Sequence, residues 1–269
     1  MPKSLALATR PAPIAELPMP IPAEIHPESL LALPPGEAKQ SLLTVHSILE
    51  ARLPAGPLAI YEAGGGSTSY LPLGVLRRAH VTVVDIDPDQ IRNNSYAHEA
   101  ILGDIQTYRP PQRFDLIICY NVIEHIPDVE AVLRGFCEAL KPNGLLLIGA
   151  PNPTSLSGIV TKYSPHWFHV WFYRTIRGEK HAGLPGEAPF PTHFHPLVTP
   201  DKLEAFVADR GLQVIYRKKY ESPRYPEMRR RKPILAAAID AAAKMMNAVL
   251  PGRIDVRHGD YHVILRKLG

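Results

Sequence analysis

Between residues 58 and 150 the sequence alternates short apolar segments with segments of helical periodicity, and this alternation most constrains the fold. The apolar segments are rich in branched side chains, which is typical of strands buried on both faces. Strands that alternate with helices form a parallel sheet covered by helices on both sides. We therefore expect an α/β, doubly wound, Rossmann-like fold. Its strands are predicted at residues 59–63, 80–87, 100–104, 114–120, 145–150, 212–220 and 261–267.

The helices are predicted from periodicity and from their end signals. Pro88 and Pro200 stand at first helical positions, where a missing N–H is tolerated, and Thr199 is suited to cap the helix it precedes. Pro72 falls in the first turn of another helix. Asn143 follows a helix in the segment Leu-Lys-Pro-Asn-Gly and tolerates the left-handed conformation of a turn. The predicted helices are residues 36–53, 67–79, 88–98, 129–140 and 199–210.

Three stretches interrupt this pattern. Residues 1–35 are rich in proline and predict an extended arm. Residues 36–269 are expected to form one domain, with insertions at about 152–198 and 221–260. The first insertion is too long for a plain connection, so we expect it to be a lid or acceptor region.

Composition indicates an ordinary soluble chain. A formal net charge of +4 is mild and does not by itself imply nucleic acid. The two cysteines, Cys119 and Cys137, lie in apolar or helical surroundings, so buried thiols in a reducing compartment are expected. The sequence has no run of about 18 apolar residues, and prolines interrupt its N-terminal segment too often for a signal peptide. We therefore expect a cytoplasmic protein.

A triple glycine, Gly64-Gly65-Gly66, follows the first predicted strand. Glycines at a strand end allow positive φ and a close approach of a ligand to the backbone. A dinucleotide site would need a further glycine at position 69, which is Ser69, and Glu62 just before the glycines would repel a phosphate. The loop is therefore better suited to a cationic ligand.

The next three strands also end in polar residues. Asp85 ends the second strand, Asp104 follows the third, and Asn121 follows the fourth. Ligands of doubly wound sheets bind outside the carboxyl ends of the strands. A carboxylate at the second strand suits the two hydroxyls of a ribose, and one at the third suits the amine of a purine.

These segments together resemble the class I S-adenosylmethionine-dependent methyltransferases. The resemblance covers about residues 55–153 and implies a seven-stranded sheet, mostly parallel with the last strand antiparallel. Asn143 departs from the usual glycine, and Glu62 stands where aspartate is common. The motifs are YEAGGGS at 61–67, VVDIDP at 83–88, LGDI at 102–105, FDLIICYNVIEHIPD at 114–128 and LKPNGLLLIGAPNP at 140–153.

By this resemblance, the cofactor is S-adenosylmethionine and no metal is required. Asp85 would hold the ribose, Ile86 would pack on the adenine, and Asn121 would lie near the sulfonium. The residues implied to bind the cofactor are Glu62, Ala63, Gly64, Gly65, Gly66, Asp85, Ile86, Gly103, Asp104, Ile105 and Asn121.

Glu124 and His125 are the candidate catalytic residues, because histidine is a natural general base near neutral pH. An alternative is that His125 only orients its loop. The first insertion adds histidines and aromatics that suit a lid over an acceptor pocket. His193 and His195 form a conceivable but incomplete metal pair. The predicted acceptor contacts are His166, His169, Tyr173 and His193.

The second insertion carries a basic run followed by an apolar helix. Leu235, Ile239, Ala242, Met246 and Val249 are expected on one stripe, with Asp240, Lys244 and Asn247 opposite. Residues 217–250 suit either peripheral contact with an anionic membrane or docking on the domain or on a second copy of the chain. A homodimer is thus left open, and nucleic acid is not favoured, since no RNA-binding module is recognised.

The sequence therefore predicts methyl transfer from S-adenosylmethionine to a small-molecule or lipid-like acceptor, with O-methylation as the leading hypothesis. The motif layout around the Glu-His pair also resembles enzymes of quinone biosynthesis. Two alternatives stay open. One is methylation of RNA or protein, and the other is a cofactor-binding partner protein that has lost catalysis.

Overall fold

The computed structural model describes residues 36–184, 189–193, 195–249, 255 and 257–269, so the predicted proline-rich arm at 1–35 lies outside the described residues. The described chain forms one seven-stranded sheet with strand order β3-β2-β1-β4-β5-β7-β6. Strands β1 to β5 pair in parallel, and β7 pairs antiparallel with both β5 and β6. This confirms the predicted fold class. The strands are β1 Leu58–Ala63, β2 Ala79–Asp85, β3 Glu99–Leu102, β4 Phe114–Tyr120, β5 Leu140–Pro151, β6 Leu212–Tyr220 and β7 Asp260–Lys267.

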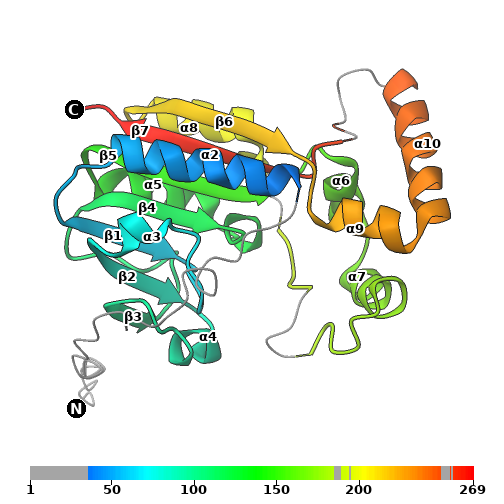
Figure 1. Cartoon of the computed structure of the whole chain (residues 1–269), viewed down its shortest axis with the longest axis horizontal. Coiled ribbons are helices and arrows are strands. Elements are labelled where there is room, and N and C mark those ends of the chain that lie inside the picture. Colours follow the sequence, from blue (N-terminus) through cyan, green and yellow to red (C-terminus); the bar gives the residue numbers. More distant parts are fainter. Residues whose placement is uncertain (1–35, 185–188, 194, 250–254, 256) are drawn as a thin grey trace, which may run out of the picture.

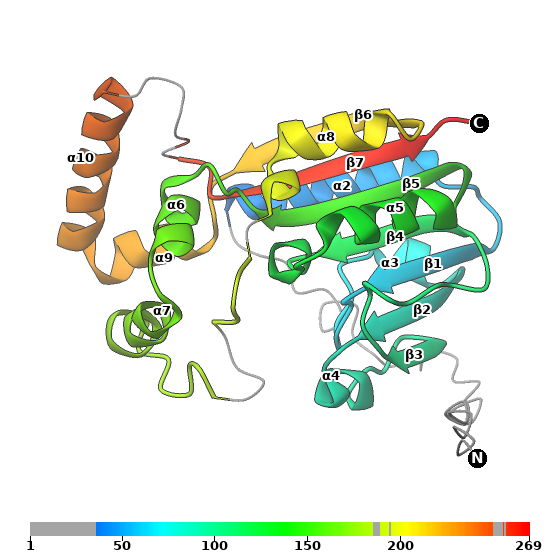
Figure 2. The ribbon, with the colours of Figure 1, turned by 180° about the vertical axis from the view of Figure 1, so that it is seen from behind.

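Helices cover both faces of the sheet (Figure 1). Helix α2 (Glu37–Arg52) lies on one face, where Leu42, Val45 and Leu49 are buried against the sheet. On the opposite face lie α5 (Val129–Ala139) and α8 (Pro200–Ala208), as Figure 2 shows from behind. The burial of apolar side chains on both faces explains why the strand segments are continuously hydrophobic. Cys119 and Cys137 are buried free thiols, as predicted.

The chain after β1 is less helical than predicted. Only α3, Leu73–Leu76, forms within the predicted helix 67–79. Pro72 is the N-cap residue of α3 and has an extended backbone, with a ψ of 142°. Leu71, which precedes this proline, is also disfavoured in a helical conformation. The hydroxyl of Ser69 also accepts from the N–H of Leu71, which holds this segment as a loop.

The neighbouring elements are also shorter than predicted. Helix α4 is Pro88–Arg92, with Asp87 as its cap, and the chain turns at Asn94, whose side-chain oxygen accepts from the N–H groups of the residues that follow. Thr199 occupies the N-cap position of α8, but its side chain makes no capping hydrogen bond, so that part of the prediction is wrong. Asn143 has a φ of 62°, which confirms the left-handed conformation expected there.

The two insertions form a helical module at the carboxyl ends of the strands (Figure 1). The first contains α6 (Leu156–Tyr163), α7 (His166–Phe172) and a π-helical turn (Tyr173–Arg177). The second contains α9 (Arg224–Arg231) and α10 (Pro233–Val249).

Backbone hydrogen bonds tie these insertions together. The N–H of Asn152 donates to the carbonyl of Gly259 at 2.7 Å, and the N–H of Asp255 donates to the carbonyl of Thr154 at 2.9 Å. The carboxylate of Asp255 is 3.0 Å from the Nδ1 atom of His258. The carboxyl ends of the strands are therefore bordered by segments of both insertions, which these backbone hydrogen bonds join.

Helix α10 turns inward a face that overlaps the predicted stripe, because Leu235, Ile239 and Met246 are partly buried. Ala236 and Ala243 are its buried residues, while Val249, assigned to the apolar stripe, is 72% exposed. Asp240, assigned to the outer face, accepts a hydrogen bond from the hydroxyl of Tyr225 on α9 at 2.8 Å. The inward face thus includes Asp240 beside the predicted residues, while Val249 at the end of the stripe is left outside.

Candidate active site

Four polar strand ends meet at one edge of the sheet. Glu62 lies near the end of β1, Asp85 ends β2, Asp104 follows β3 and Asn121 follows β4. Because β3, β2, β1 and β4 are consecutive neighbours in the sheet, these residues form a continuous row. The arrangement of the strand ends is the one predicted from the sequence.

The glycine loop after β1 is packed too tightly for side chains. Gly64 and Gly66 have φ values of 69° and 58°. A Cβ atom on Gly64 would overlap the side chain of Val122. The N–H of Gly66 donates to Oδ2 of Asp85 at 3.0 Å, which fixes the loop against the end of β2. A loop of this kind leaves the backbone open to close approach by a ligand.

Glu62 is buried beneath this loop. Its carboxylate accepts hydrogen bonds from the hydroxyl of Ser69 at 2.6 Å and from the hydroxyl of Tyr96 at 3.0 Å. Burial raises the pKa of Glu62 to about 7, and these two hydrogen bonds oppose the rise. A cationic ligand nearby would favour the carboxylate form. Tyr96 is 34 positions away from its partner, and no motif or periodicity indicated this contact.

An apolar platform lies beside Asp85. Ile86 is 73% exposed and Leu102 is 56% exposed, although both are large hydrophobic residues. Asp85 is paired with Leu102 across β2 and β3. An exposed apolar surface flanked by a carboxylate suits a planar base attached to a ribose. The residues present therefore fit a nucleoside cofactor, and Leu102 is an addition to the predicted set.

The carboxylate of Asp104 is engaged locally. It accepts from the backbone N–H of Gln106 at 2.8 Å and from its side-chain amide at 3.0 Å. The side-chain bond involves a flexible group that a purine amine can replace. Gly103 and Ile105 flank Asp104, and the N–H of Gly103 donates to the carbonyl of Asp85.

Asn121 has a left-handed backbone with a φ of 55°. Its N–H donates to the carbonyl of Gly149 at 2.7 Å, and the ring of Tyr120 stacks on that of Tyr70 at 4.0 Å. Non-glycine residues with positive φ concentrate at functional sites, where surrounding contacts hold them. The strand end beside the glycine loop is therefore rigidly defined.

A buried polar cluster supports this strand end. The hydroxyls of Tyr120 and Tyr220 lie 2.8 and 2.9 Å from Nε2 of His262, and Oγ of Ser41 lies 2.8 Å from Nδ1. Burial lowers the pKa of His262 to about 3, so its ring is neutral. This cluster joins α2, β4, β6 and β7, and sequence spacing alone did not indicate it.

Glu124 and His125 lie on a short 3₁₀ helix after β4, Ile123–His125. Nδ1 of His125 is 2.7 Å from the carbonyl oxygen of Pro191. A carbonyl can only accept, so Nδ1 carries the proton and Nε2 keeps its lone pair. Burial lowers the pKa of His125, so the neutral ring is favoured.

Glu124 is buried next to this histidine. Its Oε1 atom is 3.7 Å from Nε2 of His125, and its Oε2 atom is enclosed without a hydrogen-bond partner among the described residues. Burial raises the pKa of Glu124 to about 8, with the nearby charge of Asp260 adding to the rise. Glu124 is therefore mostly protonated at neutral pH.

Of the predicted acceptor residues, His193 is the one joined to the Glu124 loop by a hydrogen bond in the described part of the chain. Its N–H donates to the carbonyl of Glu124 at 2.9 Å. His166 and His169 lie on α7, where Nε2 of His169 contacts Ser164 at 3.1 Å, and Tyr173 begins the following π-helical turn. No three potential metal-ligating side chains come together in the described ranges. The predicted strand spacing of His193 and His195 depends on residue 194, which lies outside the described residues.

Comparison with known proteins places the fold in a family. The family described as "Methyltransferase domain" matches residues 46–217. A ubiquinone biosynthesis O-methyltransferase of Methylobacterium nodulans is 32% identical over 174 residues, covering 61% of this chain and 63% of that protein. The mitochondrial enzyme of the same name from Bos taurus is 27% identical over 192 residues, covering 65% of this chain and 47% of that protein. The chain thus spans less than two thirds of the length of these relatives.

Solved structures share the fold at low sequence identity. A putative sarcosine dimethylglycine methyltransferase from Galdieria sulphuraria aligns with a TM-score of 0.52 at 13% identity, over 86% of this chain and 87% of that one. The YcgJ protein from Bacillus subtilis aligns with a TM-score of 0.52 at 12% identity, over 85% of this chain and 98% of that one. Both agree with the sheet described above.

Proposed function

Because the chain belongs to the methyltransferase domain family, we propose that it transfers a methyl group from S-adenosylmethionine to an oxygen atom of a small-molecule or lipid-like acceptor. The observation that carries this proposal is the geometry of His125. Its Nδ1 atom donates to the carbonyl of Pro191, and its Nε2 atom keeps a lone pair at the carboxyl edge of the sheet. A hydroxyl must lose its proton as it is methylated, and a neutral imidazole in this tautomer accepts that proton.

The carboxyl edge of β1 to β4 supplies the contacts to the cofactor in this proposal. S-adenosylmethionine brings an already activated methyl group, so the task of the protein is to align the acceptor with it. Asp85 binds the ribose hydroxyls, and Ile86 with Leu102 borders the purine. The remaining residues proposed to hold the cofactor are Glu62, Ala63, Gly64, Gly65, Gly66, Gly103, Asp104, Ile105 and Asn121.

His125 and Glu124 act together on the acceptor proton. Nε2 of His125 would take the proton of the acceptor hydroxyl, and the bound cofactor would supply the methyl group and leave as its thioether, so that the product is a methyl ether. The imidazolium that forms lies 3.7 Å from Oε1 of Glu124, and the dipole of this carboxyl oxygen stabilises the positive ring. The ring then returns its proton to water.

The names of the relatives support an oxygen acceptor on a ubiquinone precursor or a chemically similar phenol. Aromatic side chains of the first insertion support an apolar acceptor as well. The ring of Phe190 contacts His125 edge to face at 6.0 Å. His193, on the same segment, is hydrogen-bonded to the Glu124 backbone, whereas His166, His169 and Tyr173 stay predicted acceptor contacts.

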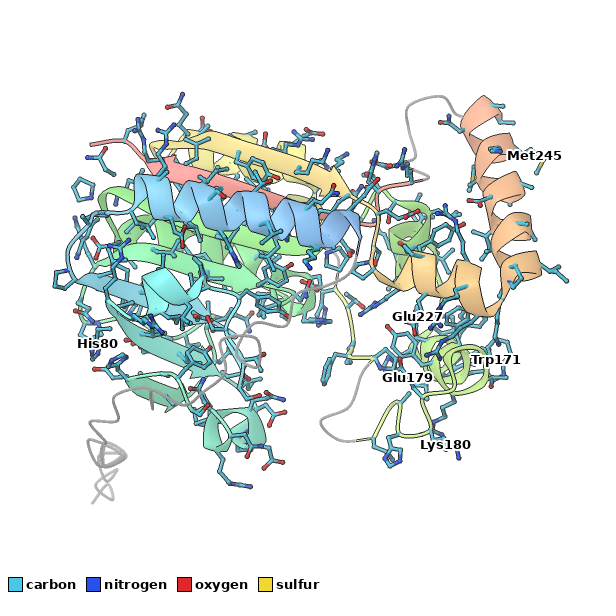
Figure 3. All side chains as sticks on the ribbon, in the orientation of Figure 1. His80, Trp171, Glu179, Lys180, Glu227 and Met245 are labelled. Atoms are coloured by element: carbon cyan, nitrogen blue, oxygen red, sulfur yellow. The ribbon has the colours of Figure 1, made fainter. Side chains whose placement is uncertain are left out.

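A peripheral membrane contact through 217–250 is the second part of the proposal. On α10, Ile234 is 86% exposed and Met245 is 70% exposed, and Figure 3 shows Met245 pointing away from the body of the protein. Arg230 and Lys232 lie at the start of this helix, while Arg229 and Arg231 are paired with acids. Apolar side chains beside cations that have no ion pair among the described residues suit an anionic lipid surface.

The first insertion extends this surface. Trp167 is 68% exposed, and Trp171, labelled in Figure 3, is 47% exposed. Aromatic residues of this kind are enriched where a protein meets a bilayer surface. None of the helices in the described part of the chain has the length and apolar character needed to cross a bilayer. Docking of α10 on a second copy of the chain is the competing use of the same surface.

The experiment that tests the function supplies methyl-labelled S-adenosylmethionine with separate pools of phenolic small molecules, lipid extract, RNA and protein. Label is expected in the phenolic or lipid pool, as an ether that mass spectrometry locates on oxygen. Label in RNA or protein would favour the macromolecular alternative. Cofactor binding without a labelled product in any pool would favour a partner protein that lacks catalysis.

A further inference from the structure

A cavity of about 370 Å³ lies on the α5 face of the sheet, and neither the glycine loop nor His125 lines it. The connection between β3 and β4 forms one wall and α5 forms the other, and Figure 2 shows this face in front. Its size lies within the range of small-molecule sites, which is about 300–1,000 Å³. Of its lining residues, only Ile105 is also among the proposed cofactor contacts.

Aromatic rings form the floor of the cavity. The centroid of Tyr61 lies 5.6 Å from that of Tyr108 and 6.1 Å from that of Phe136. Tilted and edge-to-face arrangements at these distances are the ones that aromatic rings prefer, so a further planar ring fits the same pattern. Ile105 and Val132 complete an apolar interior.

The hydroxyl of Tyr61 is left without a partner inside this cavity. The side chain is 2% exposed, and within the described part of the chain no group hydrogen-bonds to its oxygen. Tyr61 lines the cavity, and its hydroxyl oxygen is not among the fully enclosed unpaired atoms of the described residues. A buried polar group in this position gains free energy from a ligand that hydrogen-bonds to it.

Gly135 keeps the wall of the cavity open. It lies in the interior of α5, where glycine destabilises a helix relative to alanine. No atom lies within 4 Å of the position that a Cβ would take, so neither packing nor a positive φ requires glycine here. A larger side chain would project into the space beside Phe136.

The mouth of the cavity is positively charged overall. Arg109 and Arg113 stand on one side, and Glu138 stands on the other. Arg109 donates to the carbonyls of Gln106 and Tyr108 at 3.0 Å, which holds its guanidinium at the opening. Arg113 has no ion pair in the described ranges and is exposed, so it is free to bind an anionic group.

From these features we infer that the cavity is a second small-molecule site, which binds a compact aromatic carboxylic acid. The ring lies among Tyr61, Tyr108 and Phe136, a polar substituent reaches the Tyr61 hydroxyl, and the carboxylate pairs with Arg113 at the mouth. This inference is independent of the proposed proton transfer, because neither His125 nor any predicted acceptor contact lines the cavity.

The test is calorimetric titration of the whole protein with benzoate, using benzyl alcohol as the uncharged probe of similar shape. Benzoate is expected to bind with a dissociation constant on the order of 1 mM, as suits a ligand of this size, and benzyl alcohol more weakly. Gly135→Met fills the cavity and should abolish binding. Arg113→Gln should weaken the binding of benzoate by about fivefold and leave the binding of benzyl alcohol unchanged, since only the carboxylate loses a partner.

Matched variants separate this site from the acceptor site and from loss of folding. Gly135→Ala adds a methyl group to open space and should retain binding, and Arg92→Gln removes an exposed arginine elsewhere. His125→Ala should leave the benzoate affinity unchanged. No heat of binding at about 10 mM benzoate, equal affinity in Gly135→Met, or loss only in His125→Ala would overturn the inference. Arg113→Gln is a surface change, so it decides the question even if Gly135→Met fails to fold.

Discussion

Nδ1 of His125 donates to the carbonyl oxygen of Pro191 at 2.7 Å, across 66 positions of sequence. This hydrogen bond joins the loop after β4 to the first insertion and fixes the ring tautomer that leaves Nε2 unprotonated. The insertion thus has two roles in the proposed mechanism. It borders the acceptor, and it prepares the base.

The pH dependence of methyl transfer follows from this contact. Burial lowers the pKa of His125 below its ordinary value of 6.5, so the active neutral ring persists into mildly acidic solution. We expect kcat/KM to rise with pH through an acid limb whose midpoint lies below 6.5. His125→Ala should lose this limb and reduce kcat by about 10²–10⁴-fold, as removal of a general base does.

The control for this prediction is His80→Ala, because His80 is a half-exposed residue of β2 that pairs with Glu99. Its profile should match the wild type. A wild-type midpoint above 6.5, or a His125→Ala enzyme with the same acid limb, would show that His125 only orients the loop.

Glu124 should make stability depend on pH. Its pKa is raised from 4.5 to about 8 by burial, so its contribution to stability is fully present below about pH 4.5 and is lost as pH rises toward 8. Glu124→Gln removes this loss. In urea unfolding, the free energy of unfolding of the variant relative to wild type should increase by on the order of 3 kcal/mol between pH 5 and pH 8.5.

Glu130→Gln is the matched control, since Glu130 is an exposed acid on α5 that pairs with Arg134. The difference between its free energy of unfolding and that of wild type should stay nearly constant over the same pH range. A Glu124→Gln curve parallel to the wild-type curve would mean that Glu124 ionises normally in the folded protein.

The glycine loop should not accept a side chain. Gly64→Ala places a methyl group against Val122 at a φ of 69°, so we expect a loss of roughly 1–3 kcal/mol, or several degrees in Tm. Gly56→Ala, where no atom lies within 4 Å, should change Tm by about a degree or less. Equal melting temperatures for the two variants would contradict the packing described for the loop.

The outward face of α10 should control how much of the protein binds to vesicles and floats with them. Replacing Ile234 and Met245 together by serine removes two exposed apolar side chains and should lower partitioning onto phosphatidylglycerol vesicles roughly tenfold. Asn247→Ser is the control on the same helix. Unchanged flotation of the double variant, or a shift from dimer to monomer in size-exclusion chromatography instead, would assign this face to a second copy of the chain.

The sequence was sufficient for features that depend on neighbouring residues. Apolar runs located the strands, and the polar residues that follow them marked one edge because parallel strands end together. Asp85 and Asn121 were found in this way. The identity of the family also followed from short local motifs.

Features that depend on distant partners were not predictable. Glu62 is held by Tyr96, and Tyr120 by His262, and sequence periodicity carries no information about such pairs. The loop at 67–72 was mistaken for helix because its side-chain hydrogen bonds override propensity. The inward face of α10 was predicted only in part, because Asp240, assigned to the outer face, hydrogen-bonds to Tyr225 on α9, and Ala242 and Val249 are exposed.

Calorimetric titration with S-adenosylmethionine tests the central claim, that the carboxyl edge of the sheet binds this cofactor. Wild type should bind one equivalent, and Asp85→Ala should weaken binding by about tenfold or more, since the ribose hydroxyls lose a charged acceptor. Asp89→Ala, an exposed acid on α4 that pairs with Arg92, should bind like wild type. No binding by wild type, or undiminished binding by Asp85→Ala, would contradict the account.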